Sequence, residues 1–384
     1  MNYDVIIVGG GLTGLSLAVA LRRSRLTVAV VEGRVPLRPP GWDARIYAVS
    51  PANARFLESI GIWTHLDATR IAPVRKMRVR GDGNSELNFS AYDSGVGELA
   101  WIVESSLLQA ELWESAKRQG NIELCCPATP ASLEIGDHAV TLELADRRTL
   151  TAKLLVAADG ADSWTRTAAG IDVSFLPYDQ AGVVANFAVA RPHREVAYQW
   201  FRADGVLAYL PLPDNKISIV WSTSAKHADE LLALDAKEFC ARVAAAGEDA
   251  LGALELVTPP AAFPLRLMRA PRTVAHRLVL IGDAAHTIHP LSGHGINLGF
   301  QDALSLSALL AACPAHVDHG DWQRLRRHER ARREEVVALQ SATHGLQRLF
   351  GAPQSPVAAL RNFGLNFVDR LPVLKDVLVR YAMG

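Results

Sequence analysis

Three short runs of consecutive apolar residues stand out along the chain. They lie at residues 4–8, 154–158 and 278–281, and each leads through Gly or Asp into a helical pattern. Uninterrupted apolar strands of this length are typical of a parallel sheet that is covered on both faces. Because the runs are far apart, we expect one such sheet assembled from distant segments.

Between residues 183 and 223 the pattern changes to strands joined by turns. Apolar and polar residues alternate there, along Ile217, Ser218, Ile219, Trp221 and Ser222. Together with a Pro-Asp-Asn turn at 213–215, this period of two predicts an antiparallel sheet with one buried face. A smaller hairpin is expected over 77–89, with Gly-Asp-Gly at its tip.

The rest of the chain is predicted to be helical. Residues 322–340 carry many arginines and glutamates, and a second apolar pattern runs from Leu360 to Leu378. The charged run is most simply a solvated helix face rather than a nucleic-acid contact. The apolar pattern is expected to pack on the chain's own core, and docking to a partner or a membrane surface is the alternative.

Composition narrows the class of protein. Hydrophobic residues make up 49% and charged residues 21%, as in a globular chain, and 384 residues suffice for two packed domains. A formal net charge of +0 gives no basic face for nucleic acid. Neither a signal peptide nor a bilayer-spanning apolar stretch is apparent. The four cysteines, without Cys-x-x-Cys spacing, are expected to be reduced thiols of a cytoplasmic protein.

The first apolar run leads into a turn spaced as Gly-x-Gly-x-x-Gly. Its residues are Gly9, Gly11, Leu12, Thr13 and Gly14. Such a turn lets backbone amides and the positive end of a helix approach a pyrophosphate. The next strand ends about 20 residues on at Glu32, followed by Gly33 and Arg34, and a carboxylate there can bind a ribose. The alternative is an ordinary glycine turn with a surface glutamate.

The third apolar run leads into a second loop rich in glycine. Gly282 and Asp283 end the strand, and a helix is expected to begin within the Gly-x-Gly pattern at 293–295. An acid at this point can bind a polyol hydroxyl, and the helix amino terminus can stabilise an anionic flavin ring. We therefore expect the ribityl chain and isoalloxazine of a flavin here.

The same loop contains residue types that bind metals. They are Asp283, His286, His289 and His294. Proline and glycines make the segment a loop rather than a helix with a fixed ligand face, and no companion cysteine or carboxylate pair is apparent. Ser292 lacks the Gly-x-Ser-x-Gly elbow of a nucleophile. We expect no metal.

The second apolar run ends at Asp159 and Gly160 and continues to Ser163 and Arg166. An ordinary helix cap explains these residues as well as a binding site does. The residues alone leave both interpretations open.

In this order, the three motifs resemble those of the single-component (class A) flavoprotein monooxygenases, namely GxGxxG, DGxxSxxR and GDAAHxxxP. Further segments are similar to the ubiquinone-biosynthesis hydroxylases: Asp43 to Arg45, Ala48 to Pro51, Trp101 to Glu104, Leu210 to Pro213, Val220 to Ser222 and His289 to Gly299. The likeness covers nearly the whole chain. One difference is His294, where these enzymes usually have Gln, which affects flavin tuning or substrate fit only if that amide matters.

The resemblance assigns cofactor contacts position by position. By that likeness the pyrophosphate is faced by Gly9, Gly11 and Gly14, the ribose by Glu32, and the ribityl chain by Asp283. Arg45 resembles the family arginine near the phosphates and ribityl chain, and Asp159 the residue linked to both FAD and pyridine-nucleotide use. The isoalloxazine is assigned to Pro290, Gly293, Gly295, Ile296 and Asn297. Glu104 is also assigned to the cofactor.

The implied reaction is hydroxylation of an aromatic ring. NADPH or NADH, as a transient donor, reduces FAD, O2 adds to form a C4a-hydroperoxide, and an electron-rich ring takes the distal oxygen. The implied substrate is a polyprenylated phenol or quinol of ubiquinone synthesis. Candidate walls of its pocket are Trp200, Phe201, Tyr209 and Trp221, although plain core is the favoured interpretation of each. No general base is identified, so the catalytic residues stay unknown.

The implied fold is α/β and similar to para-hydroxybenzoate hydroxylase. It has a Rossmann-like FAD-binding domain with a parallel sheet, an antiparallel-sheet substrate domain and C-terminal helices. The expected boundaries are 1–74, 100–176 and 266–330 for the FAD-binding domain, 75–99 and 177–265 for the substrate domain, and 331–384 for the helical region. No second GxGxxG follows a separate strand, so no separate NAD domain is expected.

Other functions stay open at this point. They are a class A hydroxylase of another small aromatic, a flavin-dependent reductase of isoprenoid double bonds, and a non-catalytic flavin-bound scaffold of a biosynthetic complex. Other quinone-biosynthesis proteins, and a peripheral contact with the inner membrane face, are the partners to test. The oligomeric state is left undetermined.

Overall fold

The structure, a computed structural model, describes residues 1–81, 85–288, 295–314 and 316–351. In this part of the chain the strands form three sheets of eight, nine and three strands, here called the parallel, antiparallel and small sheets. The helices are α1 (Leu12–Ala20), α2 (Pro51–Ser59), α3 (Ser105–Lys117), α4 (Trp164–Ala168), α5 (Ala225–Leu232), α6 (Ala236–Ala246), α7 (Gly295–Ala311) and α8 (Trp322–Gly351). Short 3-10 turns are η1 (Trp63–His65), η2 (Ala68–Arg70) and η3 (Gly282–Ala284).

The parallel sheet brings the three apolar runs together. Its strand order is β18 (Val274–Ala275), β19 (Leu278–Leu280), β11 (Thr149–Ala157), β1 (Asn2–Val8), β2 (Val28–Val31) and β8 (Ile122–Cys125). Off this row, β10 (Val140–Leu144) pairs antiparallel with β11, and β9 (Pro130–Ile135) pairs antiparallel with β10. β1 pairs in parallel with β11 and β2, and β11 with β19. The predicted assembly of one sheet from distant segments is confirmed.

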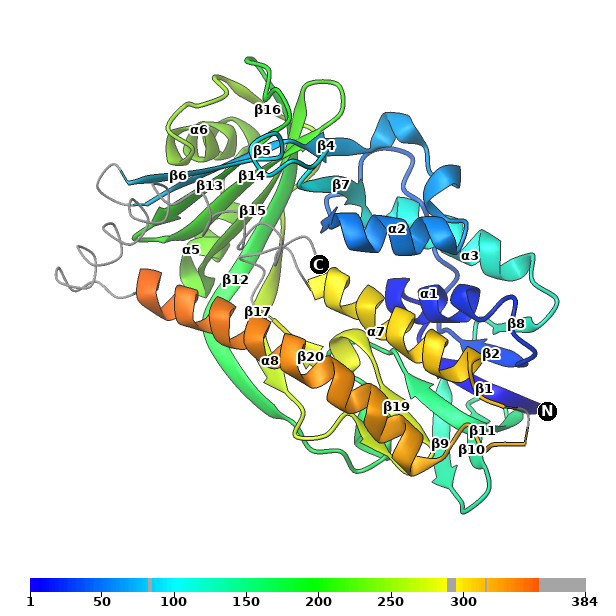
Figure 1. Cartoon of the computed structure of the whole chain (residues 1–384). Helices are drawn as coiled ribbons and strands as arrows, with labels where there is room; N and C mark the ends of the chain where they lie inside the picture. The colour runs from blue at the N-terminus through cyan, green and yellow to red at the C-terminus, as the bar shows by residue number, and fades with distance from the viewer. Residues whose placement is uncertain (82–84, 289–294, 315, 352–384) are drawn as a thin grey trace.

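Both faces of the parallel sheet are covered, as its apolar strands require. Alternate residues such as Val5 and Ile7 face a core shared with α1, α2, α3 and α7, and these helices lie together on one side of the sheet in Figure 1. Ile6 and Val8 face the other core, which includes residues of β10 and β11. Because side chains alternate along a strand, an uninterrupted apolar run can serve two cores at once.

The antiparallel sheet is built around four long strands. Its order is β20 (His286–Thr287), β17 (Ala261–Arg269), β12 (Ser174–Val189), β15 (Lys216–Ser224), β14 (Gly205–Leu212), β13 (Val196–Arg202), β5 (Lys76–Arg80) and β6 (Glu86–Ser90), and β16 (Leu254–Leu256) pairs with β12. The predicted hairpin is confirmed as β5 and β6, although its tip at 82–84 lies outside the described residues.

The prediction of a single buried face is wrong for β15. Ile217, Ile219 and Trp221 join a core that includes residues of α5 and α6, as expected. Ser218 and Ser222 on the opposite face are buried too. The reason is that this face lies against other parts of the chain: Asn186, which pairs with Ser218, donates a hydrogen bond of 2.9 Å to the carbonyl of Asp43.

The small sheet joins the two larger sheets. It consists of β3 (Ile46–Val49), β7 (Ala100–Glu104) and β4 (Ala72–Val74), in that order. Its Val74 and Ile102 pack against Ala197 and Leu212 of the antiparallel sheet. The segments near Arg45 and Glu104 are thereby fixed between the two large sheets.

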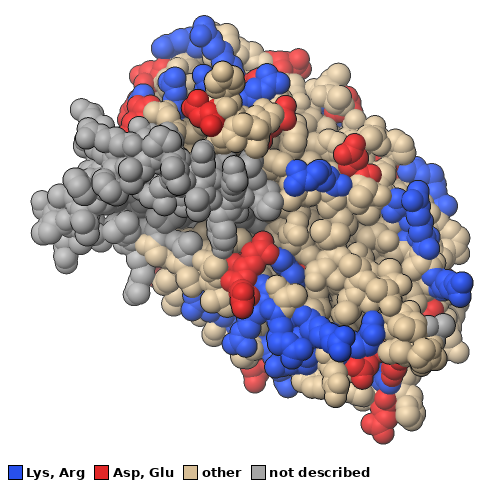
Figure 2. Space-filling model, viewed as in Figure 1, with Lys and Arg blue, Asp and Glu red and all other residues tan. Residues whose placement is uncertain are grey.

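The long helix α8 runs from the parallel sheet toward the antiparallel sheet (Figure 1). Lys and Arg side chains gather over it in the lower part of the face shown in Figure 2. Arg327, Arg330 and Arg333 are exposed, which confirms a solvated face, but Arg332 is buried. Interpreting the whole run as solvated is therefore wrong for Arg332, because an acidic partner on α7 compensates its charge. The apolar pattern at 360–378 lies outside the described residues.

Candidate cofactor site

The three sequence motifs meet at one edge of the parallel sheet. The carboxyl ends of β1, β11 and β19 are neighbours, with Val8 paired to Ala157 and Ala157 paired to Leu280. The backbone continues this contact, since Ala158 donates to Val8 and Ile281 to Ala157. Ligands of open α/β sheets bind beyond the carboxyl ends of the strands. Gly9, Asp159 and Gly282 therefore begin their turns at the place where a dinucleotide is expected.

The first glycine turn combines tight packing with an open side. A Cβ on Gly9, where φ is +109°, would lie 2.3 Å from the carbonyl oxygen of Ala158, and one on Gly14 would lie 2.1 Å from that of Gly9. Gly11 has nothing within 4 Å of the same position. Directly after it α1 begins at Leu12, so the free N–H groups of a helix start border this space. The arrangement fits a pyrophosphate.

The two residues between these glycines point elsewhere. Leu12 is buried in the core on the helical side of the sheet. Thr13 packs against two glycines of other segments, because a Cβ on Gly282 or Gly299 would meet its hydroxyl at 2.9 or 2.4 Å. Their side chains therefore fasten α1 to η3 and α7.

Glu32 lies beside the glycine turn at the end of β2. Its two carboxylate oxygens accept hydrogen bonds from the backbone N–H of Gly10 at 2.6 Å and of Arg34 at 3.0 Å. Gln109 of α3 donates to the Gly10 carbonyl at 2.9 Å, a contact that no sequence motif indicated. Gly33 and Arg34 are exposed. These two N–H groups fix where the carboxylate lies, and the ribose role of Glu32 stays a prediction.

The middle motif forms a helix cap that reaches the late motif. Asp159 accepts hydrogen bonds from the Ser163 hydroxyl at 2.5 Å and from the Thr165 N–H at 2.9 Å. Ser163 in turn caps α4, as the cap interpretation expects. The buried Arg166 donates to the carbonyl of Ala284 at 3.0 Å. Asp159 therefore fixes the turn that carries Arg166, and Arg166 in turn holds Ala284, the residue after Asp283. A contact between Asp159 and a cofactor stays a prediction.

Glu104 holds the segment that carries Arg45. Its buried carboxylate accepts hydrogen bonds from Arg70 Nε at 2.8 Å, Arg70 Nη2 at 2.7 Å and the Asp43 N–H at 2.6 Å. Both oxygens thus already serve this segment, and a direct cofactor contact of Glu104 stays a prediction. Arg45 is exposed and lies 5.6 Å from the centre of the Tyr47 ring.

Asp283 lies on η3, at the edge where the three turns meet. It remains accessible to solvent, yet the surrounding protein partly desolvates the carboxylate and raises its pKa, an effect that His286 and Arg45 oppose. The exposed Arg45 therefore acts electrostatically on the Asp283 carboxylate. An accessible acid beside a cation at this edge fits a group rich in hydroxyls.

The start of α7 is fixed by an asparagine. Asn297 accepts from the Ser50 N–H and donates to the Ala48 carbonyl, at 2.9 and 2.8 Å, and is buried. Gly295 and Ile296 are half-buried at the same helix start. Pro290, Gly293, His289 and His294 lie outside the described residues. The side chain of Asn297 therefore ties α7 to β3 and α2, which leaves backbone groups of this helix start for a ring.

A buried acid behind Asp283 was not assigned any role from the sequence. Asp302 of α7 accepts hydrogen bonds from the Gly282 N–H at 2.9 Å and from Arg332 Nε at 2.7 Å, and lies 2.7 Å from His286 Nε2. A signal existed: Asp302 is the one charged residue in the sequence of α7. A lone acid on an apolar helix needs buried partners.

The proposed aromatic wall belongs to the core. Trp200, Tyr209 and Trp221 are almost completely buried in the core that includes residues of α5 and α6, and Phe201 packs with Val79 and Leu87. The core interpretation favoured for each of them holds.

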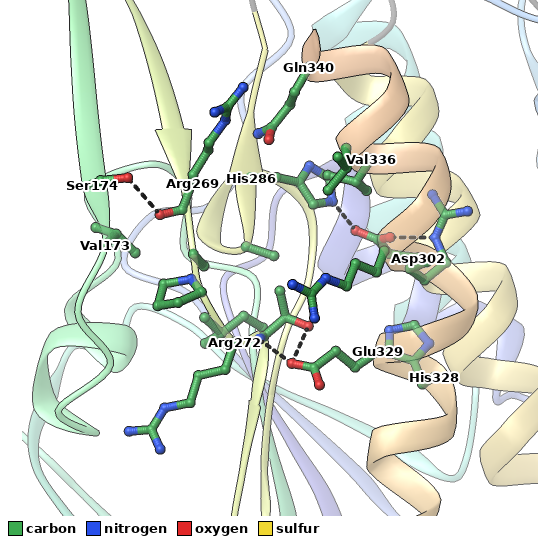
Figure 3. Close-up of a pocket in the computed structure, with 18 of the residues that line it drawn as sticks. Val173, Ser174, Arg269, Arg272, His286, Asp302, His328, Glu329, Val336 and Gln340 are labelled. Carbon is green, nitrogen blue, oxygen red and sulfur yellow. Dashed lines mark hydrogen bonds and ion pairs between the residues drawn. The ribbon is translucent and has the colours of Figure 1, made fainter.

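A cavity of about 640 Å³ lies between α8 and the ends of β12 and β17 (Figure 3). Its walls include His286 and Asp302 but none of the glycines of the first turn. Within the described ranges, no three His, Cys, Asp or Glu side chains are grouped to hold a metal ion. No helix in that same part of the chain is long and apolar enough to cross a bilayer.

Comparisons with known proteins agree with this geometry. The FAD binding domain family matches residues 2–342. The ubiquinone hydroxylase UbiL of Rhodospirillum rubrum is 36% identical over 99% of this chain and 89% of its own length, and the 3-demethoxyubiquinol 3-hydroxylase of Escherichia coli is 32% identical over 99% and 98%.

A solved structure supports the fold. The p-nitrophenol 4-monooxygenase PnpA of Pseudomonas putida superposes with a TM-score of 0.82 at 17% identity, covering 100% of this chain and 99% of its own. The expected α/β fold, with a parallel and an antiparallel sheet, is therefore confirmed, and FAD is the cofactor. The chain belongs to the FAD-binding-domain family, as an FAD-dependent monooxygenase related to the ubiquinone-biosynthesis hydroxylases.

Proposed function

We propose that this enzyme hydroxylates the aromatic ring of a polyprenylated phenol or quinol in ubiquinone biosynthesis, with NADPH or NADH as transient electron donor and O2 as oxidant. The main structural support for this proposal is that the turns at Gly9, Asp159 and Gly282 meet at one edge of the parallel sheet. The names of its relatives, a ubiquinone hydroxylase and a demethoxyubiquinol hydroxylase, support the substrate class.

In this proposal the chain positions FAD along that edge. The Gly9–Gly14 turn and the start of α1 bind the pyrophosphate, Glu32 the ribose, and Asp283 with Arg45 the ribityl chain. The backbone at Gly295–Asn297 faces the ring, and Pro290 and Gly293 are assigned beside it. FAD supplies the redox chemistry when bound, and the protein orients it and excludes water from the reacting ring.

The finer organisation belongs to the same proposal. Residues 1–74, 100–176 and 266–330 form the FAD-binding domain, 75–99 and 177–265 the substrate domain, and 331–384 a helical region. A polyprenyl tail partitions into a bilayer, so we place the enzyme in the cytoplasm with a peripheral contact to the inner membrane face. Other quinone-biosynthesis proteins are its proposed partners.

The test is a lipid-quinone profile of a strain that lacks this protein. We expect ubiquinone to fall and one prenylated aromatic, lacking a single hydroxyl group, to accumulate. Purified enzyme should then consume NAD(P)H and O2 when given that compound and return the hydroxylated product. Unchanged ubiquinone in the deletion strain would exclude the proposed role in ubiquinone biosynthesis. A product that is reduced without O2 uptake would indicate an isoprenoid reductase. FAD binding without turnover would indicate a scaffold.

A further inference from the structure

Behind the cofactor edge, charged side chains from five segments alternate in sign. The series runs from α8 through α7 and β20 to η3 and the residue before β3: Arg332, Asp302, His286, Asp283 and Arg45. Figure 3 shows the first part of it, with Asp302 between His286 and the α8 side of the cavity. An alternating series of this kind stabilises each member through its neighbours.

Asp302 is the centre of the buried part. Only about 2% of its surface is exposed, and one oxygen binds Arg332 Nε at 2.7 Å while the other accepts the Gly282 N–H and contacts His286 Nε2. A buried carboxylate costs several kcal/mol of free energy unless charged partners compensate it. Although burial opposes ionisation, His286 and Arg332 hold the pKa of Asp302 below its usual range. Asp302 is therefore an anion tied directly to the turn of Asp283.

His286 connects this anion to Asp283. Its ring is buried, which disfavours the imidazolium, but the charge and hydrogen bond of Asp302 and the charge of Asp283 raise its pKa. Arg332 opposes that rise. His328, the other imidazole near Asp302, has a pKa lowered by burial and is neutral. Glu335 forms an ion pair with Arg332, on the far side of that arginine's contact with Asp302. His286 begins β20, three residues after Asp283, and is a buried cation that acts on the Asp283 carboxylate.

We propose that His286 and Asp302 are positioning residues for FAD: Asp302 fixes the Gly282 turn and the charged His286 ring, and that ring keeps Asp283 a carboxylate able to accept hydrogen bonds from ribityl hydroxyls. Desolvation raises the pKa of Asp283, and His286 and Arg45 are the two groups that oppose it. The inference rests on the proposed contact between Asp283 and the ribityl chain.

The experiment titrates FAD into the apoprotein and follows flavin fluorescence, giving Kd at pH values from about 5 to 8. In the wild type, affinity should weaken only toward acid pH, where Asp283 takes up a proton. Asp302→Asn keeps the side chain's shape and an acceptor for Gly282 but removes the charge. His286 then loses the partner that raises its pKa most, its positive charge is weakened, and we expect the midpoint of the acid limb to move up by about one pH unit.

His286→Gln removes the cation while leaving Asp302 in place. It should move the midpoint in the same direction and raise Kd about fivefold at the wild-type midpoint. The double variant should shift no further than either single variant, because each of the three variants ends in the loss of the same His286 cation beside Asp283. If Asp302→Asn does not fold, His286→Gln alone still tests the proposal.

The matched control is Asp318→Asn. Asp318 also pairs with a buried arginine, Arg277, but near β18 and β19, outside the series of charges. Asp318→Asn should leave the pH midpoint of FAD binding unchanged, even if it lowers the stability of the protein. Kd values that rise equally at every pH in Asp302→Asn and His286→Gln would show a merely structural role and overturn the inference. If Asp283→Ala itself leaves FAD affinity unchanged, the proposed cofactor placement fails instead.

Discussion

The two turns at the cofactor edge are specified in opposite ways. The Gly9–Gly14 turn depends on side chains that are missing, since added Cβ atoms at Gly9 and Gly14 would meet backbone oxygens at 2.3 and 2.1 Å. The Gly282–Asp283 turn depends on side chains that are present, because Asp302 holds its backbone and Arg166 the carbonyl of the next residue.

The turns also touch each other. Thr13, from the first turn, packs against Gly282 and against Gly299 of α7. The close packing at Gly9 and Gly14 is independent of pH and salt. The buried ionic contacts behind the Gly282–Asp283 turn instead respond to protonation. The Gly9–Gly14 turn is therefore a rigid support at the proposed cofactor edge, and the Gly282–Asp283 turn sets the charge presented there.

The largest effect should come from the steric turn. Gly9→Ala places a methyl group against the Ala158 carbonyl in a backbone conformation with φ at +109°, which L residues rarely adopt. We expect the free energy of unfolding to fall by more than about 3 kcal/mol and FAD binding to be lost. Chemical denaturation and FAD titration measure both quantities.

Gly11→Ala is the matched control for this change. Gly11 has ordinary extended backbone and nothing within 4 Å of an added Cβ. Stability should stay within about 0.5 kcal/mol of the wild type, while FAD affinity falls because the methyl enters the space proposed for the pyrophosphate. If Gly9→Ala and Gly11→Ala lower the free energy of unfolding equally, the proposed difference between a packed and an open glycine is wrong.

The second effect concerns the link between the middle and late motifs. Arg166→Gln removes a buried guanidinium that donates to the carbonyls of Ala284 and Ala161. We expect a loss of about 2 to 3 kcal/mol in the free energy of unfolding, together with weaker FAD retention. Arg148→Gln, which breaks an exposed pair with Asp146, should cost less than about 1 kcal/mol. If Arg148→Gln lowers the free energy of unfolding more than Arg166→Gln does, the proposed support of the late motif by Arg166 is contradicted.

The sequence predicts the first turn better than the second for a physical reason. Glycine spacing, an apolar strand and an acid about 20 residues later are local features, so Gly9, Gly14 and Glu32 could be placed without a structure. The support of Asp283 needs Asp302 and Arg332, which become neighbours only after α7 and α8 pack together. In the sequence alone, Arg332 is one arginine among many on a charged helix.

The same reason explains the other differences. The alternation along β15 correctly predicted which face meets α5 and α6, but Ser218 and Ser222 are buried by a segment far away in sequence. Glu104 matched a family segment, yet only the structure shows both of its oxygens bound to Arg70 and Asp43. Periodicity reports a residue's own element and says little about what covers the other side.

The third prediction tests whether the charged turn acts on the cofactor rather than on folding. Asp283→Ala should raise the Kd of FAD about tenfold or more at neutral pH, because a charge-assisted hydrogen bond to the ribityl chain is lost. The Asp283 side chain is exposed to solvent, so we expect the thermal midpoint of the apoprotein to stay close to that of the wild type. Flavin retained after dialysis is the readout, and Asp137→Ala, at an exposed acid, is the control. Full occupancy after dialysis would count against the ribityl role.

The smallest effect should come from Glu32, the one carboxylate attached to the steric turn. Glu32→Gln keeps the shape of the side chain, but an amide has one acceptor oxygen for the two N–H groups of Gly10 and Arg34. One hydrogen bond is therefore lost, and we expect about 1 kcal/mol of destabilisation and a several-fold weaker FAD Kd. Glu134→Gln, at an exposed position on β9, should change neither. Because Glu32 adjusts a turn that sterics already fix, its FAD Kd should change less than that of Asp283→Ala; the reverse order would show that charge, not size, governs both turns.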